Sequence, residues 1–212
     1  TATANEVTRE DIIQALRLES AELFVGNFDR PNIQYAIEEN QGDQKSRLME
    51  FIRDSLGDGS GIVYCTTKKK VDQTCEWLNQ KGINAIAYHA GMSKKERETS
   101  LNTFLQDDKI VAVATIAFGM GIDKADVRFV AHLNLPKSLE AYYQETGRAG
   151  RDGLPSKVWM SYSLADMIQL RRWVRESDAP MEIQQIESQK LSAILAFAES
   201  SQCRRQLLLQ YF

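Results

Sequence analysis

The chain has 212 residues, of which 43% are hydrophobic, and a formal net charge of −3. It contains no apolar run of the ~18 residues that a membrane span needs, and residues 1–5 lack the basic and apolar regions of a secretory signal. With three cysteines the sequence predicts no disulfide framework, so we expect a reducing setting, either cytoplasmic and nucleoid-associated or nuclear.

Strand-like and helix-like periods alternate along most of the chain. Segment 1–18 predicts a loop and one helix, and segment 23–32 predicts an extended connector, since Pro31 disfavours helix before it. Runs of β-branched and apolar residues then predict strands at 61–65, 84–88, 110–114, 127–133 and 157–162. Apolar residues with a period near 3.6 predict helices at 43–56, 68–81, 93–105 and 138–146.

This alternation predicts an α/β fold with a doubly wound parallel sheet, followed by a helical subdomain. We expect three regions, which are the remnant of a preceding domain at 1–25, the sheet domain at 26–163 and the helical subdomain at 164–212. The last region predicts helices at 164–176, 181–200 and 203–212.

Lysines cluster after two of the predicted strands. Thr66 and Thr67 precede lysines at 68–70, and His89 and Gly91 precede lysines at 94 and 95. Cations are unfavourable in the first turn of a helix, where a bound phosphate would offset the conflict. The alternative is that all five lysines point into water. Two such sites on one sheet edge slightly favour phosphate binding.

A third strand end carries Thr115, Gly119, Gly121 and Asp123. The glycines permit a close approach of the backbone to a ligand, the threonine can donate to a phosphate, and the aspartate can accept from a ribose hydroxyl. The alternative is an ordinary glycine-containing turn, and the spacing alone favours that turn.

Segment 144–153 contains Arg148 and Arg151 among three glycines. Each glycine would cost about 1 kcal/mol inside a helix, so a loop is predicted here. Arginine binds phosphate oxygens through two parallel hydrogen bonds. The alternative is that both arginines pair with local carboxylates such as Glu145 and Asp152.

Segment 144–153 resembles motif VI of superfamily 2 helicases in the form found in the RecQ family. In the same order, 1–4 resembles the end of motif III, 28–32 the connector between the lobes, 61–65 motif IV and 112–123 motif V. The resemblance implies a RecA-like lobe of a two-lobe motor, which binds ATP between its lobes and single-stranded DNA across both.

The resemblance also implies a role for each candidate residue. Arg151 would be the arginine finger, with Arg148 and Gln144 beside it, and Gly121 and Asp123 would complete the nucleotide side. The residues expected to lie towards DNA are Thr66, Thr67, His89, Gly91 and Thr115. The implied activity is ATP-dependent 3′–5′ unwinding of partly duplex DNA in recombination and repair, with the first lobe as partner and Mg²⁺ accompanying ATP.

Two parts of such a motor are missing from the sequence. It contains no Gly-x-x-x-x-Gly-Lys-Ser/Thr and no Asp-Glu-x-His/Asp, which the family carries in the first lobe. We therefore expect no ATPase activity from this chain alone.

Segment 164–212 resembles the scaffold of the RecQ zinc-binding region, in which Cys203 would be the first of four cysteine ligands. Zn²⁺ is thus expected in an intact enzyme and not in this chain. Cys65 and Cys75 are predicted to be packed residues.

Two other functions stay open. One is the lobe of an RNA helicase or remodelling translocase, which shares the arginine motif. The other is a stand-alone nucleic-acid-binding module. The connector and Cys203 favour the RecQ interpretation.

Overall fold

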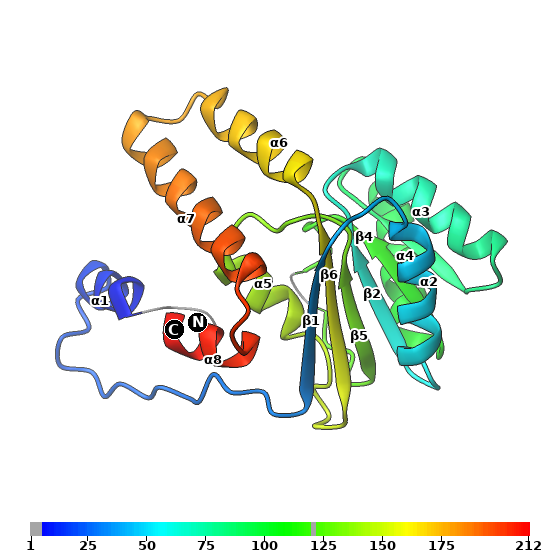
Figure 1. Cartoon of the computed structure of the whole chain (residues 1–212). Coiled ribbons are helices and arrows are strands. Elements are labelled where there is room, and N and C mark those ends of the chain that lie inside the picture. The colour runs from blue at the N-terminus through cyan, green and yellow to red at the C-terminus, as the bar shows by residue number, and fades with distance from the viewer. Residues whose placement is uncertain (1–5, 120–121) are drawn as a thin grey trace.

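The computed structural model describes residues 6–119 and 122–212 (Figure 1). Segment 1–4 and Gly121, predicted to belong to motifs III and V, lie outside the described residues. The strands are β1 (Ile33–Glu39), β2 (Ser60–Tyr64), β3 (Ala85–Tyr88), β4 (Val111–Ala114), β5 (Val127–His132) and β6 (Ser156–Tyr162). The helices are α1 (Glu6–Ala15), α2 (Gln44–Ser55), α3 (Lys68–Gln80), α4 (Lys94–Gln106), α5 (Leu139–Thr146), α6 (Leu164–Arg175), α7 (Met181–Glu199) and α8 (Arg204–Tyr211).

The strands form one six-stranded sheet in the order β1-β6-β5-β2-β4-β3, and every neighbouring pair is parallel. The chain reverses direction across the sheet at β2, because β3 and β4 lie on one side of it and β5 on the other. The predicted doubly wound parallel sheet is confirmed, with α2 and α3 on one side and α5 and α7 on the other (Figure 1).

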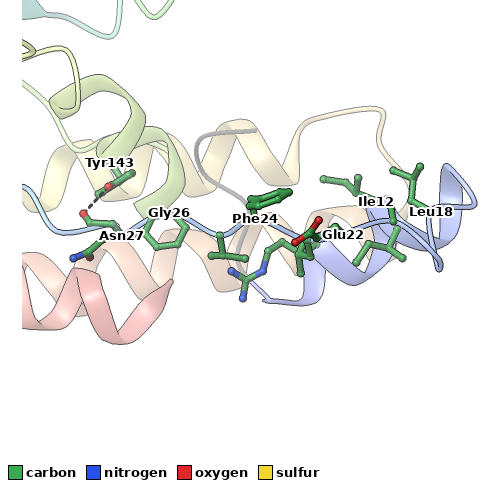
Figure 2. A pocket seen from close by; sticks show the side chains of 13 residues that line it. Ile12, Leu18, Glu22, Phe24, Gly26, Asn27 and Tyr143 are labelled. Atoms are coloured by element: carbon green, nitrogen blue, oxygen red, sulfur yellow. Dashed lines mark hydrogen bonds between the residues drawn. The ribbon is translucent and has the colours of Figure 1, made fainter.

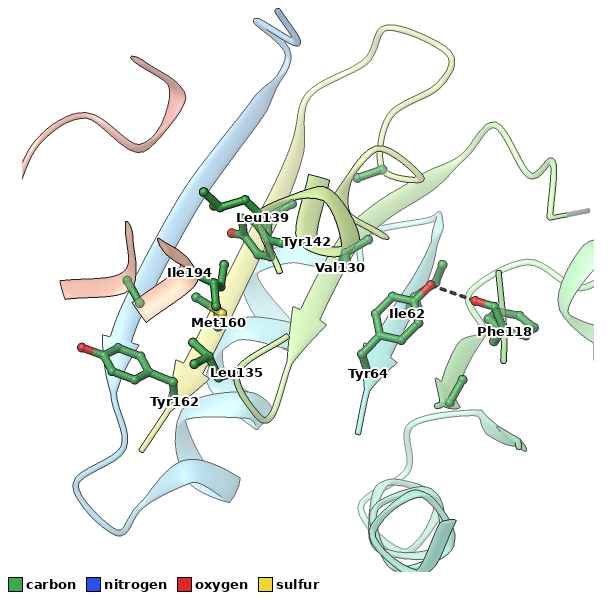
Figure 3. Packing of buried hydrophobic residues seen from close by; sticks show 14 of the residues in the cluster. Ile62, Tyr64, Phe118, Val130, Leu135, Leu139, Tyr142, Met160, Tyr162 and Ile194 are labelled. Atoms are coloured by element: carbon green, nitrogen blue, oxygen red, sulfur yellow. Dashed lines mark hydrogen bonds between the residues drawn. The ribbon is translucent and has the colours of Figure 1, made fainter. Parts of the chain in front are cut away.

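Two buried clusters cover the two faces of the sheet, because successive side chains in a strand point in opposite directions. In β2, Ile62 and Tyr64 belong to one cluster, while Val63 and the following Cys65 belong to the other. The first cluster contacts α5 and α7 (Figure 3), and the second lies under α2 and α3. The central strands are therefore buried on both faces.

Side-chain caps stand at the start of α3, α4 and α5, where the sequence predicts helices to begin. Ser93 and Glu96 form a capping box at the start of α4, in which each side chain accepts a hydrogen bond from the other residue's backbone N–H. The side chain of Thr67 accepts from the N–H of Lys70 and so caps α3. Ser138 caps α5 in the same way.

The sequence interpretation missed strand β1. It pairs with β6 along its whole length, from Ile33 opposite Ser156 to Glu39 opposite Tyr162. As an edge strand it is covered on one side only, and it ends in Glu38 and Glu39, so it lacks the continuous apolar run of the central strands. Pairing with β6 decides its conformation.

The C-terminal helices pack against the sheet domain through aromatic rings. Tyr142 of α5 is fully buried, with the ring of Phe197 of α7 at 5.5 Å and the ring of Tyr35 of β1 at 6.3 Å. The helix break predicted near Pro180 separates α6 from α7. No helix in the described part of the chain is long and apolar enough to cross a membrane.

Candidate nucleic-acid and nucleotide sites

The candidate DNA residues lie together at the carboxyl ends of three neighbouring strands. Thr66 follows β2, Thr115 follows β4 and His89 follows β3, and β4 lies between the other two strands. In open parallel sheets this edge, near the reversal of strand order, is where ligands bind. The structure therefore brings together the residues that the sequence placed on one sheet edge. We call Thr66, His89 and Thr115, with the adjoining starts of α3 and α4, the strand-end group.

One lysine of this strand-end group does not behave as predicted. Lys70 does not face a phosphate site, because its Nζ donates to the backbone oxygen of Leu133 at 2.8 Å and to side-chain oxygens of Gln44 and Asn134 at 3.2 Å. Its burial lowers its pKa below the usual value for lysine. Lys68 and Lys69 remain exposed at the start of α3.

His89 stabilises the turn that contains Gly91. The imidazole is only 7% exposed, its Nε2 donates to Asp72 Oδ1 at 2.9 Å, and its Nδ1 accepts from the Gly91 N–H at 3.1 Å. Both ring nitrogens are occupied, so any DNA contact of this turn involves other atoms. A β-carbon on Gly91 would lie 2.9 Å from Lys68 Cδ, so the glycine permits α3 and this turn to approach closely.

The predicted arginine segment runs from the carboxyl end of β5, where Glu145 meets His132, to the amino end of the same strand. We call residues 147–154 the arginine loop. The Gly150 N–H donates to the backbone oxygen of Val127, the first residue of β5, and Arg128 pairs with Asp152 at 2.5 Å. The backbone of the loop is therefore anchored at the amino end of β5.

Arg148 is buried with only 7% exposure, and none of the ion pairs among the described residues includes it. Its guanidinium lies against Gly119, where an added β-carbon would be 3.0 Å from its terminal nitrogen. It also lies beside the Tyr64 hydroxyl, which donates to the Phe118 oxygen at 2.9 Å. Burial raises the pKa of Tyr64, and Arg148 opposes that shift.

Arg151 pairs with Asp123, which was also predicted to lie on the nucleotide side. Its guanidinium donates to Asp123 Oδ1 at 2.8 Å and to the backbone oxygen of Ile122 at 2.9 Å. The Asp123 side chain is 88% exposed, and such a surface pair contributes only about 0–1 kcal/mol. The guanidinium is thus accessible to a competing anion.

The alternative partners expected for the arginines are engaged elsewhere. Glu145 accepts a hydrogen bond from His132 Nε2 at 2.7 Å, and Asp152 pairs with Arg128. Neither arginine therefore pairs with Glu145 or Asp152, although Arg151 does pair with the carboxylate of Asp123. Gln144 is exposed on α5 beside Glu145.

Sequence reasoning missed the buried His132–Glu145 pair. His132 is 2% exposed at the end of β5, and its ring stacks on Tyr64 at 5.2 Å between centroids. The bond joins the end of β5 to the last turn of α5, which leads into the arginine loop. A histidine within a buried strand was the available signal.

The cysteines divide into two buried thiols and one exposed thiol. Burial raises the pKa of Cys65 to about 12 and that of Cys75 to about 11. Cys203 lies exposed at the start of α8, where the N–H groups of Gln206 and Arg205 lower its pKa. Among the described residues no three His, Cys, Asp or Glu side chains are placed to hold a metal, so these residues alone do not fit a zinc site.

We expect a thiol-alkylating reagent at pH 7.5 to modify only Cys203 in the folded chain and all three cysteines after denaturation. The reason is that thiolate is the reacting form, and both burial and a raised pKa suppress it at the other two positions. Mass spectrometry of the intact chain counts the labels. Modification of Cys65 or Cys75 at a comparable rate would contradict the described packing.

Comparison with known proteins identifies the family. Residues 43–153 match the helicase conserved C-terminal domain, and residues 164–212 match the RecQ zinc-binding domain. The chain belongs to the helicase C-terminal domain family. The match of residues 164–212 to the RecQ zinc-binding domain shows that the chain is of RecQ type. The resemblance of the arginine motif and the connector predicted this type.

Relatives support the RecQ assignment over the whole chain. The chain is 48% identical over its full length to the ATP-dependent DNA helicases RecQ of Pasteurella multocida and Haemophilus influenzae. A further relative, the ATP-dependent DNA helicase hus2/rqh1 of Schizosaccharomyces pombe, is 42% identical over the full chain. The chain spans 33% and 34% of the two bacterial relatives and 16% of the yeast one.

Solved structures confirm the fold of this helicase domain. A Saccharomyces cerevisiae Dbp5 variant bound to Gle1 and IP6 superposes with a TM-score of 0.62 at 20% identity, covering 91% of this chain and 53% of that chain. Domain 2 of the DEAD-box helicase Mss116p bound to an RNA duplex gives a TM-score of 0.55 at 15% identity, covering 84% of this chain and 87% of that chain. Both likenesses concern the fold alone.

Proposed function

We propose that this chain is the second motor lobe of an ATP-dependent 3′–5′ DNA helicase of RecQ type, acting in recombination and repair. One observation carries the proposal. Arg148 and Arg151 both lie on the arginine loop, whose backbone is anchored at β5. Arg148 has no carboxylate partner among the described residues, and Arg151 pairs only with the exposed carboxylate of Asp123. Such a pair is suited to bind the phosphates of a nucleotide held on a partner lobe.

In this proposal Arg151 exchanges Asp123 for a phosphate oxygen when the lobes close. A phosphate carries more charge than a carboxylate and accepts two parallel hydrogen bonds from one guanidinium, so it competes well for an exposed arginine. Arg148 remains against Gly119 and adds positive charge from within the lobe. Gln144, exposed on α5, would contact the same nucleotide.

Single-stranded DNA would cross the strand-end group. The hydroxyls of Thr66 and Thr115 and the first backbone N–H groups of α3 and α4 can donate to backbone phosphates. Lys68 and Lys69 supply the local positive charge. Contacts of this kind position a strand and read no sequence.

An apolar cavity supports the proposal that a first lobe packs beside this one. The cavity of about 350 Å³ lies between α1 and the connector, and Tyr143 lies near its other end (Figure 2). Its lining includes Leu23, Phe24 and Val25, which are at least half exposed, with Phe24 at 83%. Exposed apolar patches of this kind mark contacts with other protein surfaces.

The test joins this chain to the first lobe of a RecQ helicase, which supplies the P-loop that this sequence lacks. We expect the joined enzyme to hydrolyse ATP when single-stranded DNA is present and to unwind a duplex with a 3′ overhang. Neither the chain nor the first lobe alone should do so. Failure of the joined, folded enzyme to hydrolyse ATP would contradict the proposed function.

The same enzyme separates the DNA helicase from the RNA helicase interpretation. Stimulation of hydrolysis by single-stranded DNA well above stimulation by RNA of the same length supports the first. The reverse order would favour an RNA helicase lobe, and tight binding without any hydrolysis would favour a stand-alone binding module.

DNA binding by the chain itself should be weak and sensitive to salt. If the strand-end group contacts about three phosphates, log affinity falls with log salt at a slope near −2, since each phosphate on a single strand contributes roughly −0.7. Fluorescence anisotropy with two unrelated oligonucleotides across a salt series measures the slope.

The double variant Lys68→Ala/Lys69→Ala should flatten this slope, whereas Lys81→Ala, at the far end of α3, should leave it unchanged. Tight binding to one oligonucleotide with little dependence on salt would contradict phosphate contacts at the strand ends.

A further inference from the structure

Arg30, in the connector before β1, binds the backbone of the arginine loop through hydrogen bonds. Its guanidinium donates to the backbone oxygens of Gly147 at 3.1 Å, Ala149 at 2.6 Å and Gly150 at 3.0 Å. These three carbonyls flank Arg148 and immediately precede Arg151. One side chain thus holds the backbone on both sides of the first arginine, from more than 115 residues away in the sequence.

The arginine loop needs such a brace because its own sequence does not define a conformation. It contains three glycines, two of which have positive φ, with Gly150 at +58° and Gly153 at +79°. Glycine loses more backbone entropy on ordering than any other residue. Asn32 adds two further hydrogen bonds, to the oxygens of Gly150 at 2.9 Å and Leu154 at 3.0 Å.

The positive charge of Arg30 strengthens its hydrogen bonds to the loop carbonyls. Among the described residues none of the ion pairs includes it, so its hydrogen bonds to the loop are its observed interactions. The three carbonyls follow the carboxyl end of α5, where a cation is favoured by the helix dipole. A hydrogen bond to a charged donor is also stronger than one between neutral groups.

The connector is itself fixed on its other side by α8. Arg205 donates to the backbone oxygens of Pro31 at 3.1 Å and Ile33 at 2.8 Å, on either side of the connector's end. The Tyr143 hydroxyl donates to the Phe28 oxygen at 2.7 Å, and the Phe28 ring stacks on Phe212 at 5.2 Å. Arg30 is therefore presented from an anchored backbone.

We propose that Arg30 is a positioning residue that sets the geometry of the arginine loop and acts on ATP turnover through Arg151. The proposal rests on the proposed function for its effect on turnover, but its structural part concerns this chain alone. Among the described residues the Arg30 side chain donates hydrogen bonds only to the loop's backbone, so in this proposal it orients the arginines and does not itself meet the nucleotide.

In the joined enzyme, we expect Arg30→Ala to lower kcat about 10- to 100-fold while the KM for ATP and the affinity for DNA change less than about threefold. Misplacing a reacting group by about 1 Å can cost about 100-fold in rate. In the Arg151→Ala background the same substitution should cost less than about twofold, because its effect passes through Arg151. Arg30→Lys should retain more activity than Arg30→Ala and less than the parent enzyme, since lysine keeps the positive charge but has fewer N–H donors.

The matched control is Arg47→Ala, which removes an arginine that pairs with Glu38 on the surface and lies outside the arginine loop. It should leave kcat unchanged. A normal kcat in Arg30→Ala, or a loss that adds in full to that of Arg151→Ala, would overturn the proposal. If Arg30→Ala does not fold, Arg30→Gln and Arg30→Lys supply the same comparison.

A second measurement uses this chain without any first lobe. Hydrogen exchange at residues 148–153 should be at least about tenfold faster in Arg30→Ala than in the parent chain and in Arg47→Ala, with exchange in β2 and β4 unchanged. Unchanged exchange in the loop would overturn the proposal whether or not the joined enzyme hydrolyses ATP. Absence of hydrolysis in the unsubstituted joined enzyme, with faster loop exchange in Arg30→Ala, would count against the proposed function only.

Discussion

Replacing Arg151 by alanine in the joined enzyme is expected to lower ATP turnover by about 10³–10⁵-fold, which corresponds to roughly 4–7 kcal/mol of transition-state stabilisation. The affinities for ATP and DNA should change much less. The reason is that an arginine finger acts mainly on charge that develops on the transferred phosphoryl group. In the free lobe this guanidinium has a weak, exposed partner in Asp123, so little binding energy is committed before the lobes close.

Lysine at position 151 should rescue turnover poorly, because a point charge cannot form two parallel hydrogen bonds to a phosphate. Arg171→Ala, an exposed arginine on α6, is the matched control and should leave turnover unchanged. Melting temperature and single-turnover hydrolysis are measured on the same preparation. A large loss of thermal stability with near-normal hydrolysis would show that Arg151 only supports the 122–123 segment.

Replacing Tyr142 by alanine is expected to lower the free energy of unfolding by about 3–5 kcal/mol, the usual cost of removing a fully buried aromatic ring. The ring lies 5.2 Å from His132, and also contacts the rings of Tyr35 and Phe197. Its loss therefore opens a cavity where β1, β5, α5 and α7 meet. Because α5 leads into the arginine loop, the substitution should also loosen that loop.

Tyr142→Phe is the matched control, since it keeps the ring and removes a hydroxyl that has no hydrogen-bond partner among the described residues. It should cost less than about 1 kcal/mol, because a buried hydroxyl without a partner contributes no net stability. Urea denaturation of the two variants, compared at equal m-values, measures the difference. A cost below about 1 kcal/mol for the alanine variant would show that the helical region is not coupled to the sheet at this position.

The sequence by itself determined the central part of the fold. Five of the six strands and the helices between them follow from apolar periodicity, and the four central ones are mostly apolar because they are covered on both faces. The caps at Thr67 and Ser93 followed from local chemistry, since a hydroxyl or carboxylate near a helix start bonds the nearest free N–H. The motif at 144–153 was sufficient to indicate the family that the comparisons then confirmed.

Only the tertiary structure decided which distant partner each polar side chain near the candidate sites has. Lys70 turns inward to Leu133, His132 binds Glu145, and Arg30 reaches the arginine loop across more than 115 residues. The edge strand β1 also depends on its pairing with β6. Hydrogen bonds and ion pairs act over about 3 Å, and sequence order does not reveal which distant groups the fold brings within that range. The polar partners that shape the candidate sites therefore had to be read from the folded chain.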